Sequence, residues 1–466
     1  MKTWSVVSAF VLIGCQSAAF HTPALDLPAH WHAARDSREP QASNLTLRWE
    51  SVFPSSELQA LIEKALRNNS DLIIAAERIE LARIQSGIED AARLPSLRLD
   101  LGSVRQRGPG AHPTDNQISE SGRAGLLMPS WEIDLWGRLR DRAEAARRNL
   151  LAQTAQADAL RLSLIAQVSG RYLDLLDLDH QIQITERTVE ARKKSLRLNR
   201  LRFEEGISSV LDVHQAESSL AAAEQSLADQ RRRQGQTEHA LSLLLGEHPG
   251  SIQRTSGLMN LPPPAQLTAG LPSDLLIHRP DIRAAEAALA AGEANIAAAR
   301  KAYLPSVSLT TMLGFVSPAL SQLLDGNRFA WSVQPSIGLN LFDGGRTGLA
   351  IAQTEAQQRI LLEQYKVSIR QAFREVNDQL LAREQLARQR EAALRSVHSN
   401  QGRFRAANAR YLNGIASYLE VLDAERQLLD SELALSQVTR AWHQSVIQLY
   451  LALGGQWENT EKIRNL

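Results

Sequence analysis

Hydrophobic residues follow two different spacings in different parts of the chain, and each spacing predicts one kind of secondary structure. Strict alternation of apolar and polar residues predicts β-strands with one apolar and one polar face. This alternation occupies four stretches, residues 96–102, 130–135, 306–315 and 329–341. The stretches group as two hairpins. Between the strands, residues 105–122 and 317–328 are rich in Gly, Pro, Asn and Asp, which predicts exposed loops.

The predicted strands have the length of membrane strands. A tilted membrane strand needs about ten residues and is often flanked by interfacial aromatic side chains. The aromatic residues near the strand ends are Trp131, Trp136, Phe329 and Trp331. Soluble hairpins half-buried on a helical core are the alternative interpretation. Because an open sheet edge in lipid leaves backbone groups unpaired, several chains are expected to share one barrel, in a number that the strand pattern leaves open.

Each predicted hairpin leads into a very long helix. The segments 137–203 and 345–411 each span 67 residues without proline, or about 100 Å of helix. Apolar residues recur every seven positions in the first of them, at Val168, Leu175, Ile182, Val189, Leu196 and Phe203. Shorter helices are expected at 56–93, 208–245, 273–303 and 416–453. Two short helices stacked end to end have about the length of one long helix. This predicts a tall layer of antiparallel helices with the strands at one end and tight turns at the other.

The chain is an internal duplication. Residues 206–217 align with residues 414–425, an offset of 208, with seven of twelve positions identical. The predicted organisation is a signal peptide at 1–14, an N-terminal arm at 15–55, a first repeat at 56–250, a Pro-rich linker at 251–272, a second repeat at 273–454 and a tail at 455–466. Within the repeats, the strand hairpins are placed at 95–136 and 305–342, and the helical hairpins at 137–246 and 343–453.

The turns between the helices carry helix-end signals. Gly206 and Gly414 suit the left-handed conformation that ends a helix. Each is followed by an S-x-x-[DE] pattern, which predicts a capping box at the start of the returning helix. The two predicted capping boxes pair Ser209 with Asp212, and Ser417 with Glu420.

The net charge and the cysteine content limit the classes of function that the chain can have. The formal net charge of +1 disfavours a nucleic-acid binder, whose affinity depends on concentrated basic charge. The single cysteine, Cys15, excludes an internal disulfide and follows the apolar segment 6–13, as in an export signal. Leu12, Ile13, Gly14 and Cys15 resemble a bacterial lipobox, so we expect a lipid on Cys15, with an ordinary signal peptide as the alternative. No later apolar run reaches the length of a membrane-spanning helix, so strands are expected to cross the membrane.

No catalytic site is predicted, and neither a metal nor a cofactor is expected apart from the lipid on Cys15. His30 and His32 lie in the N-terminal arm without a third ligand at suitable spacing. Gly344 and Gly345 are not followed by a phosphate-loop lysine and are interpreted as a strand-to-helix bend. The basic run 231–233 is interpreted as a solvated helix face. The chain is therefore not expected to be an enzyme.

Taken together, these features resemble the TolC-like outer membrane factor family, and within it the lipoprotein exit ducts of resistance, nodulation and division type efflux pumps. The resemblance rests on the lipobox, the duplication, and the motifs at 94–96, 133–138, 304–306, 341–346 and 410–424. It implies a mixed α and β membrane protein. Each chain would give four strands to a shared trimeric twelve-stranded β-barrel, and long antiparallel helices to a periplasmic α-helical tunnel.

The resemblance also implies a gate at the periplasmic tip of the second helical hairpin. Matching the family's motif places Leu419 and Asp423 at the constriction, with Tyr411 and Glu420 nearby. Asp423 aligns with Gln215 in the first repeat, so threefold symmetry would form a carboxylate ring from one hairpin only. A helix cap is the alternative role for Glu420, and a solvated helix residue for Asp423.

The tips are expected to contact an adaptor through Gly206, Ser209, Asp212, Gly414 and Ser417. Family members carry basic or polar residues just after the tip glycine, where this chain has Ile415 and Ala416, so the corresponding tip salt bridge is not expected.

The implied function is passive export. A homotrimer in the outer membrane, lipid-anchored and extending into the periplasm, would accept substrates from an inner-membrane pump through a periplasmic adaptor. Two alternatives are the outer membrane duct of a type I protein secretion system, which the lipobox disfavours, and a non-conducting periplasmic lipoprotein scaffold.

Overall fold

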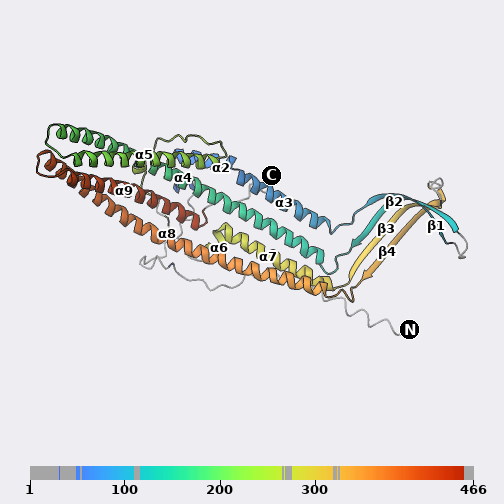
Figure 1. The fold of residues 1–466 in the computed structure, drawn as a ribbon. Helices are drawn as coiled ribbons and strands as arrows, with labels where there is room; N and C mark the ends of the chain where they lie inside the picture. The colour runs from blue at the N-terminus through green and yellow to red at the C-terminus, as the bar shows by residue number, and fades with distance from the viewer. Residues whose placement is uncertain are drawn as a thin grey trace. The chain divides into compact units, whose positions relative to one another are not determined.

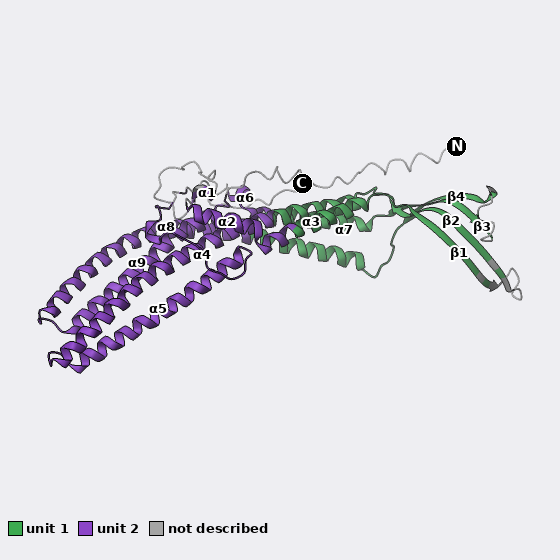
Figure 2. Cartoon of the chain, turned by 90° about the horizontal axis from the view of Figure 1, so that it is seen from above, with its two compact units in different colours: residues 1–24, 77–154, 284–366 green, residues 25–76, 155–283, 367–466 purple. Residues whose placement is uncertain are grey.

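The computed structural model describes residues 31, 49–52, 55–109, 116–264, 267, 275–318, 323 and 326–455. The chain divides into two compact units, each assembled from separate stretches of both repeats (Figure 2). Unit 1 contains residues 1–24, 77–154 and 284–366, and unit 2 contains residues 25–76, 155–283 and 367–466. Within the described residues, no helix combines the length and the hydropathy needed to cross a membrane.

The four predicted strands form one antiparallel sheet in the order β1-β2-β3-β4 (Figure 1). The strands are β1 Arg98–Pro109, β2 Asn116–Glu132, β3 Ser306–Ser317 and β4 Phe329–Gly338. The two hairpins therefore pair with each other, through β2 and β3. Gly125 and Gly314 lie opposite one another in that pair, and a Cβ on either residue would collide with the backbone of the other strand. Further along, the β2–β3 register shifts between Met128 and Trp131, as at a β-bulge.

The strand boundaries correct the sequence prediction. β1 extends to Pro109 and β2 begins at Asn116, so both strands run into the predicted loop 105–122. β2 ends at Glu132, so the predicted strand 130–135 is wrong beyond that residue, and Ile133 and Leu135 lie beyond the end of the strand. The apolar alternation stops near residue 102, but backbone pairing does not depend on apolar side chains and continues in register from Gly102 to Pro109. β4 ends at Gly338, before the alternating Leu339 and Leu341, because its partner β3 begins at the position opposite Gly338.

The long helices agree with the prediction. α4 Arg138–Glu204 and α8 Arg346–Leu412 each contain 67 residues. Their return helices, α5 Val210–Leu244 and α9 Tyr418–Ala452, contain 35 residues each. The returns begin two residues later than expected, because Ser209 and Ser417 stand outside them as N-cap residues.

Acidic residues start both long helices. The Asp134 carboxylate accepts hydrogen bonds from the backbone N–H groups of Leu139 and Arg140 in α4. Asp343 accepts from the backbone N–H groups of Gly345 and Thr347 at the start of α8. These hydrogen bonds satisfy first-turn donors and place negative charge at the positive end of each helix dipole. Gly344 and Gly345 adopt φ of 67° and 84°, which confirms the predicted strand-to-helix bend.

The helices that precede each hairpin are interrupted, contrary to the single helices expected at 56–93 and 273–303. The first divides into α2 Ser56–Asn68 and α3 Ser70–Ala91 at Asn69, whose side chain accepts from the N–H groups of Asp71 and Leu72 and so caps α3. The second divides before Pro280, which disfavours a helical conformation in the preceding residue. Its parts are α6 Leu275–His278, α7 Pro280–Arg300 and the short helix η5 Lys301–Tyr303. The remaining short elements are α1 Trp49–Val52, η3 Leu258–Asn260 and η7 Gly326–Arg328.

Unit 2 contains the heptad core and a polar anchor for the segment after α5. All the heptad residues of α4 are buried except Phe203, which is 46% exposed.

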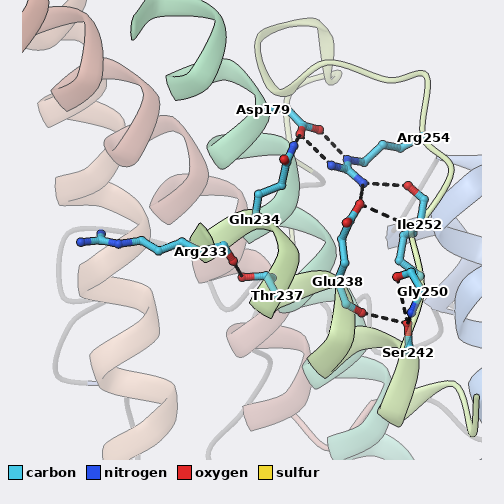
Figure 3. A network of polar contacts seen from close by, with 9 residues as sticks. All are labelled: Asp179, Arg233, Gln234, Thr237, Glu238, Ser242, Gly250, Ile252 and Arg254. Carbon is cyan, nitrogen blue, oxygen red and sulfur yellow. Dashed lines mark hydrogen bonds and ion pairs between the residues drawn. The ribbon is translucent and has the colours of Figure 1, made fainter. Parts of the chain in front are cut away.

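Arg254 binds Asp179 of α4 and Glu238 of α5, and Gln234 of α5 also donates to Asp179 (Figure 3). The hydrogen bonds with Asp179 raise the pKa of Arg254, so the guanidinium stays charged. This network fastens the segment after α5 to the two helices.

Candidate pore gate at the helical hairpin tips

Both helical hairpins turn through glycine. Gly206 and Gly414 have φ of 70° and 73°, and a Cβ at either position would meet no atom within 4 Å. Glycine is therefore required for its backbone conformation and not for space. The N–H of Gly206 bonds to Phe203 and that of Gly414 bonds to Tyr411, so the two repeats close their tips with the same backbone motif.

The side chains at the two tips differ. Ser209 accepts a hydrogen bond from the N–H of Leu211, and Asp212 accepts from the N–H of Ser209, as predicted for a capping box. Ser417 makes no side-chain cap bond. Glu420 instead lies 3.4 Å from the Arg410 guanidinium in the last turn of α8. The predicted capping box at 417–420 is therefore wrong, and its acidic residue joins α9 to α8 across the turn.

Asp423 lies in a cluster of cations. Its carboxylate is 2.6 Å from Nη2 of Arg403 on α8 and 3.0 Å from Nη2 of Arg426 on α9. Leu419, one helical turn earlier, is 58% exposed. The structure thus brings together the two residues assigned to the constriction, and it adds two arginines that sequence reasoning did not assign there. Any ring of Asp423 carboxylates would also contain these guanidinium groups.

Tyr411 lies between the hairpins and not on the exposed surface. It is buried, and its hydroxyl donates to Oδ1 of Asn199 on α4 at 2.6 Å. Tyr418 is buried as well, and its hydroxyl oxygen accepts from Ser195 at 3.2 Å. The guanidinium of Arg202 lies over the Tyr411 ring. These contacts hold the α8–α9 hairpin against α4.

A buried ion pair joins α4 and α9 farther from the tip. Arg192 of α4 and Glu425 of α9 approach to 3.5 Å, with side chains 7% and 12% exposed. Burial raises the pKa of Glu425, and the nearby Arg192 opposes that shift without cancelling it. Sequence reasoning missed these contacts, although Tyr418 and Glu425 are seven residues apart on α9.

The equivalent positions in the first hairpin supply an internal comparison. Leu211 is 60% exposed, close to the 58% of Leu419. Gln215, which aligns with Asp423, has a buried Oε1 without a hydrogen-bond partner in the described part of the chain. The two hairpins therefore differ at these positions in charge and not in the exposure of the leucine.

The other predicted features are placed as follows. Cys15, His30 and His32 lie outside the described residues. Across the described ranges, no group of three His, Cys, Asp or Glu side chains is arranged to hold a metal ion. The basic run 231–233 is exposed and forms ion pairs with Glu186 and Asp229, as expected for a solvated face.

The fold defines a class of protein. One face of the sheet exposes leucine and aromatic side chains, and a long helical hairpin follows each strand hairpin along the chain, as in a channel-forming protein of a bacterial envelope. The family model described as outer membrane efflux protein matches residues 61–247 and 271–455, once in each repeat. The chain belongs to this outer membrane efflux protein family. Its function is efflux through the outer membrane, which confirms the resemblance stated from the sequence.

Individual relatives agree with this assignment over nearly their whole length. The toluene efflux pump outer membrane protein TtgF of Pseudomonas putida is 34% identical over 98% of both chains. The cation efflux system protein CusC of Escherichia coli is 34% identical over 97% of both. The solved structure of the open state of the MtrE outer membrane channel of Neisseria gonorrhoeae superposes with a TM-score of 0.84. It is 30% identical, and the match covers 94% of this chain and 98% of that one.

Proposed function

We propose that three copies of the chain form one exit duct of a tripartite efflux system. In this proposal the duct passively conducts substrates that an inner-membrane pump delivers through a periplasmic adaptor, and it catalyses no reaction. The four-stranded sheet carries the proposal, because within it β1 and β4 each have only one neighbouring strand. Sheet edges in lipid must pair, and three such sheets joined edge to edge close a twelve-stranded barrel.

Exposed apolar helix surface supports the same assembly. Leu81, Ile84 and Ile88 lie along one side of α3 and are 67%, 53% and 55% exposed in the single chain. Three large aliphatic side chains in a row favour burial against another surface. In the trimer, helices of neighbouring copies would cover them and close the tunnel wall.

The duct is proposed to close at the tips of the α8–α9 hairpins. Around a threefold axis, Leu419 would supply an apolar layer, and Asp423 with Arg403 and Arg426 a charged layer one turn away. Glu420 and Tyr411 would brace this constriction, the first through Arg410 and the second through Asn199.

The N-terminus and the tips would hold the duct in place. Acyl chains on Cys15 would anchor the mature chain in the outer membrane, as the lipobox indicates. The turns around Gly206 and Gly414, with Ser209, Asp212 and Ser417, would face the adaptor. Their surface positions at the ends of paired helices support this role.

Single-channel conductance in planar lipid bilayers tests the duct and its gate. Leu419→Ala removes the apolar layer and should raise conductance, whereas the equally exposed Leu211→Ala should leave it unchanged. Asp423→Ala should also raise conductance, and Gln215→Ala should not. Asp423→Asn keeps the side-chain size and separates the effect of charge from that of volume.

Two results would contradict the proposal in different ways. A wild-type trimer that inserts and carries no current would exclude a duct. A conducting trimer that opens with Gln215→Ala and not with Asp423→Ala would place the gate on the other hairpin.

A further inference from the structure

The charged residues of the sheet are confined to β1 and β2. β3 and β4 contain no Asp, Glu, Lys or Arg. On β1 and β2, the alternation places Arg98, Asp100 and Arg123 on the face opposite the exposed Leu99 and Leu101. The contacts agree with this placement, because Nε of Arg123 lies 2.5 Å from Oδ1 of Asp100, and Nη2 of Arg98 lies 3.7 Å from Oδ2 of Asp100.

A glycine opposite Arg123 makes room for this cluster. Gly102 is the cross-strand partner of Arg123, and a Cβ at that position would lie 3.2 Å from Nε of Arg123. The arginine therefore lies across the glycine and reaches Asp100 two residues away on β1. Its guanidinium stays on the polar face of the sheet, and the Arg123 side chain is 59% exposed.

The cluster has an excess of positive charge. Two arginine side chains, each 59% exposed, share the carboxylate of Asp100, whose side chain is 22% exposed. Glu132, the other acidic residue of this face, is already bound through both oxygens by Arg138 of α4. The remaining polar side chains of β3 and β4 on this face are neutral hydroxyl and amide groups such as Ser308, Ser336 and Gln334. Each chain therefore presents one net positive charge on an otherwise neutral polar face.

We propose that Arg98, Asp100 and Arg123 form a cationic ring that favours small anions and anionic substrates in the strand-lined part of the channel. The inference rests on the proposed trimer, since closing the barrel with its apolar face toward lipid turns the polar face inward. Three copies place six guanidinium groups and three carboxylates around one lumen. Inside a low-dielectric wall, such a net charge raises the local concentration of anions and lowers that of cations.

Reversal potentials in a potassium chloride gradient measure this preference as the chloride-to-potassium permeability ratio. The double variant Arg98→Gln/Arg123→Gln removes six positive charges from the trimer and should lower the ratio about fourfold at low salt. Asp100→Asn removes the only carboxylate of the cluster and should raise the ratio. A role confined to holding the hairpin together would not produce opposite shifts from the two changes.

The matched control lies on the same strand. Arg105 is 70% exposed, pairs with Glu120 at 2.9 Å and shares the face of Leu99 and Leu101. Arg105→Gln should therefore leave the permeability ratio unchanged. If the double variant does not fold, Arg98→Gln alone keeps the Arg123–Asp100 pair and should lower the ratio about twofold.

The outcomes separate this inference from the proposed function. If wild-type trimers insert and carry no current, the duct is excluded and the ring with it. If trimers conduct normally and the ratio does not change in Arg98→Gln/Arg123→Gln, or changes equally in Arg105→Gln, the cationic ring is refuted and the duct stands.

Discussion

A buried ion pair in unit 1 connects the helices that precede and follow the sheet strands, and its contribution to stability can be tested. Nζ of Lys301, directly after α7, lies 2.5 Å from the carboxylate of Asp141 in the first turn of α4. The two side chains are only 9% and 4% exposed. Since α4 follows β2 almost immediately, this pair holds the two elements that lead into and out of the sheet. Lys301→Met keeps much of the side-chain volume and removes the charge.

The neighbouring residue provides the scale for the expected effect. Arg300 is also ion-paired, at 2.8 Å to Glu355, but the two side chains are 65% and 37% exposed. Lys301→Met leaves Asp141 buried without a counter-charge, which costs about 3–5 kcal/mol of unfolding free energy. Arg300→Met removes a hydrated pair and costs about 0–1 kcal/mol. The double variant Lys301→Met/Asp141→Leu should recover most of the loss, because no charge then remains buried.

Urea unfolding of the detergent-solubilised protein, followed by the helical circular dichroism signal, measures these differences. The order of stability should be wild type, Arg300→Met, the double variant and then Lys301→Met. Equal losses from Lys301→Met and Arg300→Met would show that burial does not decide the strength of these pairs. A double variant less stable than Lys301→Met would show that Asp141 contributes through contacts other than the ion pair.

Three further predictions concern other parts of the fold. Ser209→Ala should lower the unfolding free energy by about 0.5–2 kcal/mol, whereas Ser417→Ala, which removes no side-chain cap, should change it little. Gly314→Ala should reduce the yield of trimer on native gels, because a Cβ there meets the β2 backbone, while Gly87→Ala, in open space within α3, should stabilise by about 1 kcal/mol. The raised pKa of Glu425 means that its protonation stabilises the fold below about pH 4.5 and that this contribution is lost as pH rises through the raised pKa. Urea midpoints measured against pH should show this loss, and Glu425→Gln should abolish it.

Hydrophobic periodicity predicted best those elements in which one spacing of apolar residues continues over the whole length. α4 and α8 begin and end within one residue of the expected segments 137–203 and 345–411. The end of β1 and the start of β2 were missed because backbone pairing of these strands continues into polar sequence, beyond the apolar alternation. The interruption at Asn69 was missed because its capping bonds are local and leave the hydrophobic pattern of α2 and α3 intact.

The candidate site was predicted less completely, because its contacts join residues far apart in sequence. The spacing of Ser417 and Glu420 matches a capping box, and only the nearness of Arg410 across the turn directs the carboxylate elsewhere. The bond from Tyr411 to Asn199 spans 212 positions, and no local pattern encodes it. Sequence patterns therefore predicted the ends of α4 and α8 to within one residue but predicted side-chain partners at a tip poorly.

The tips of the two duplicated hairpins differ in the contacts that hold them. Both tips share the same glycine turn, so their backbones are equally restrained. The first tip adds a side-chain cap on α5, which is worth about 0.5–2 kcal/mol. The second has exposed ion pairs of Glu420 and Asp423 instead, each worth about 0–1 kcal/mol, while the buried Tyr411 and Tyr418 hold the hairpin against α4. Charged partners in water exchange at little cost, so in the proposed gate the ion pairs of the α8–α9 tip would exchange while its buried tyrosine contacts stay in place.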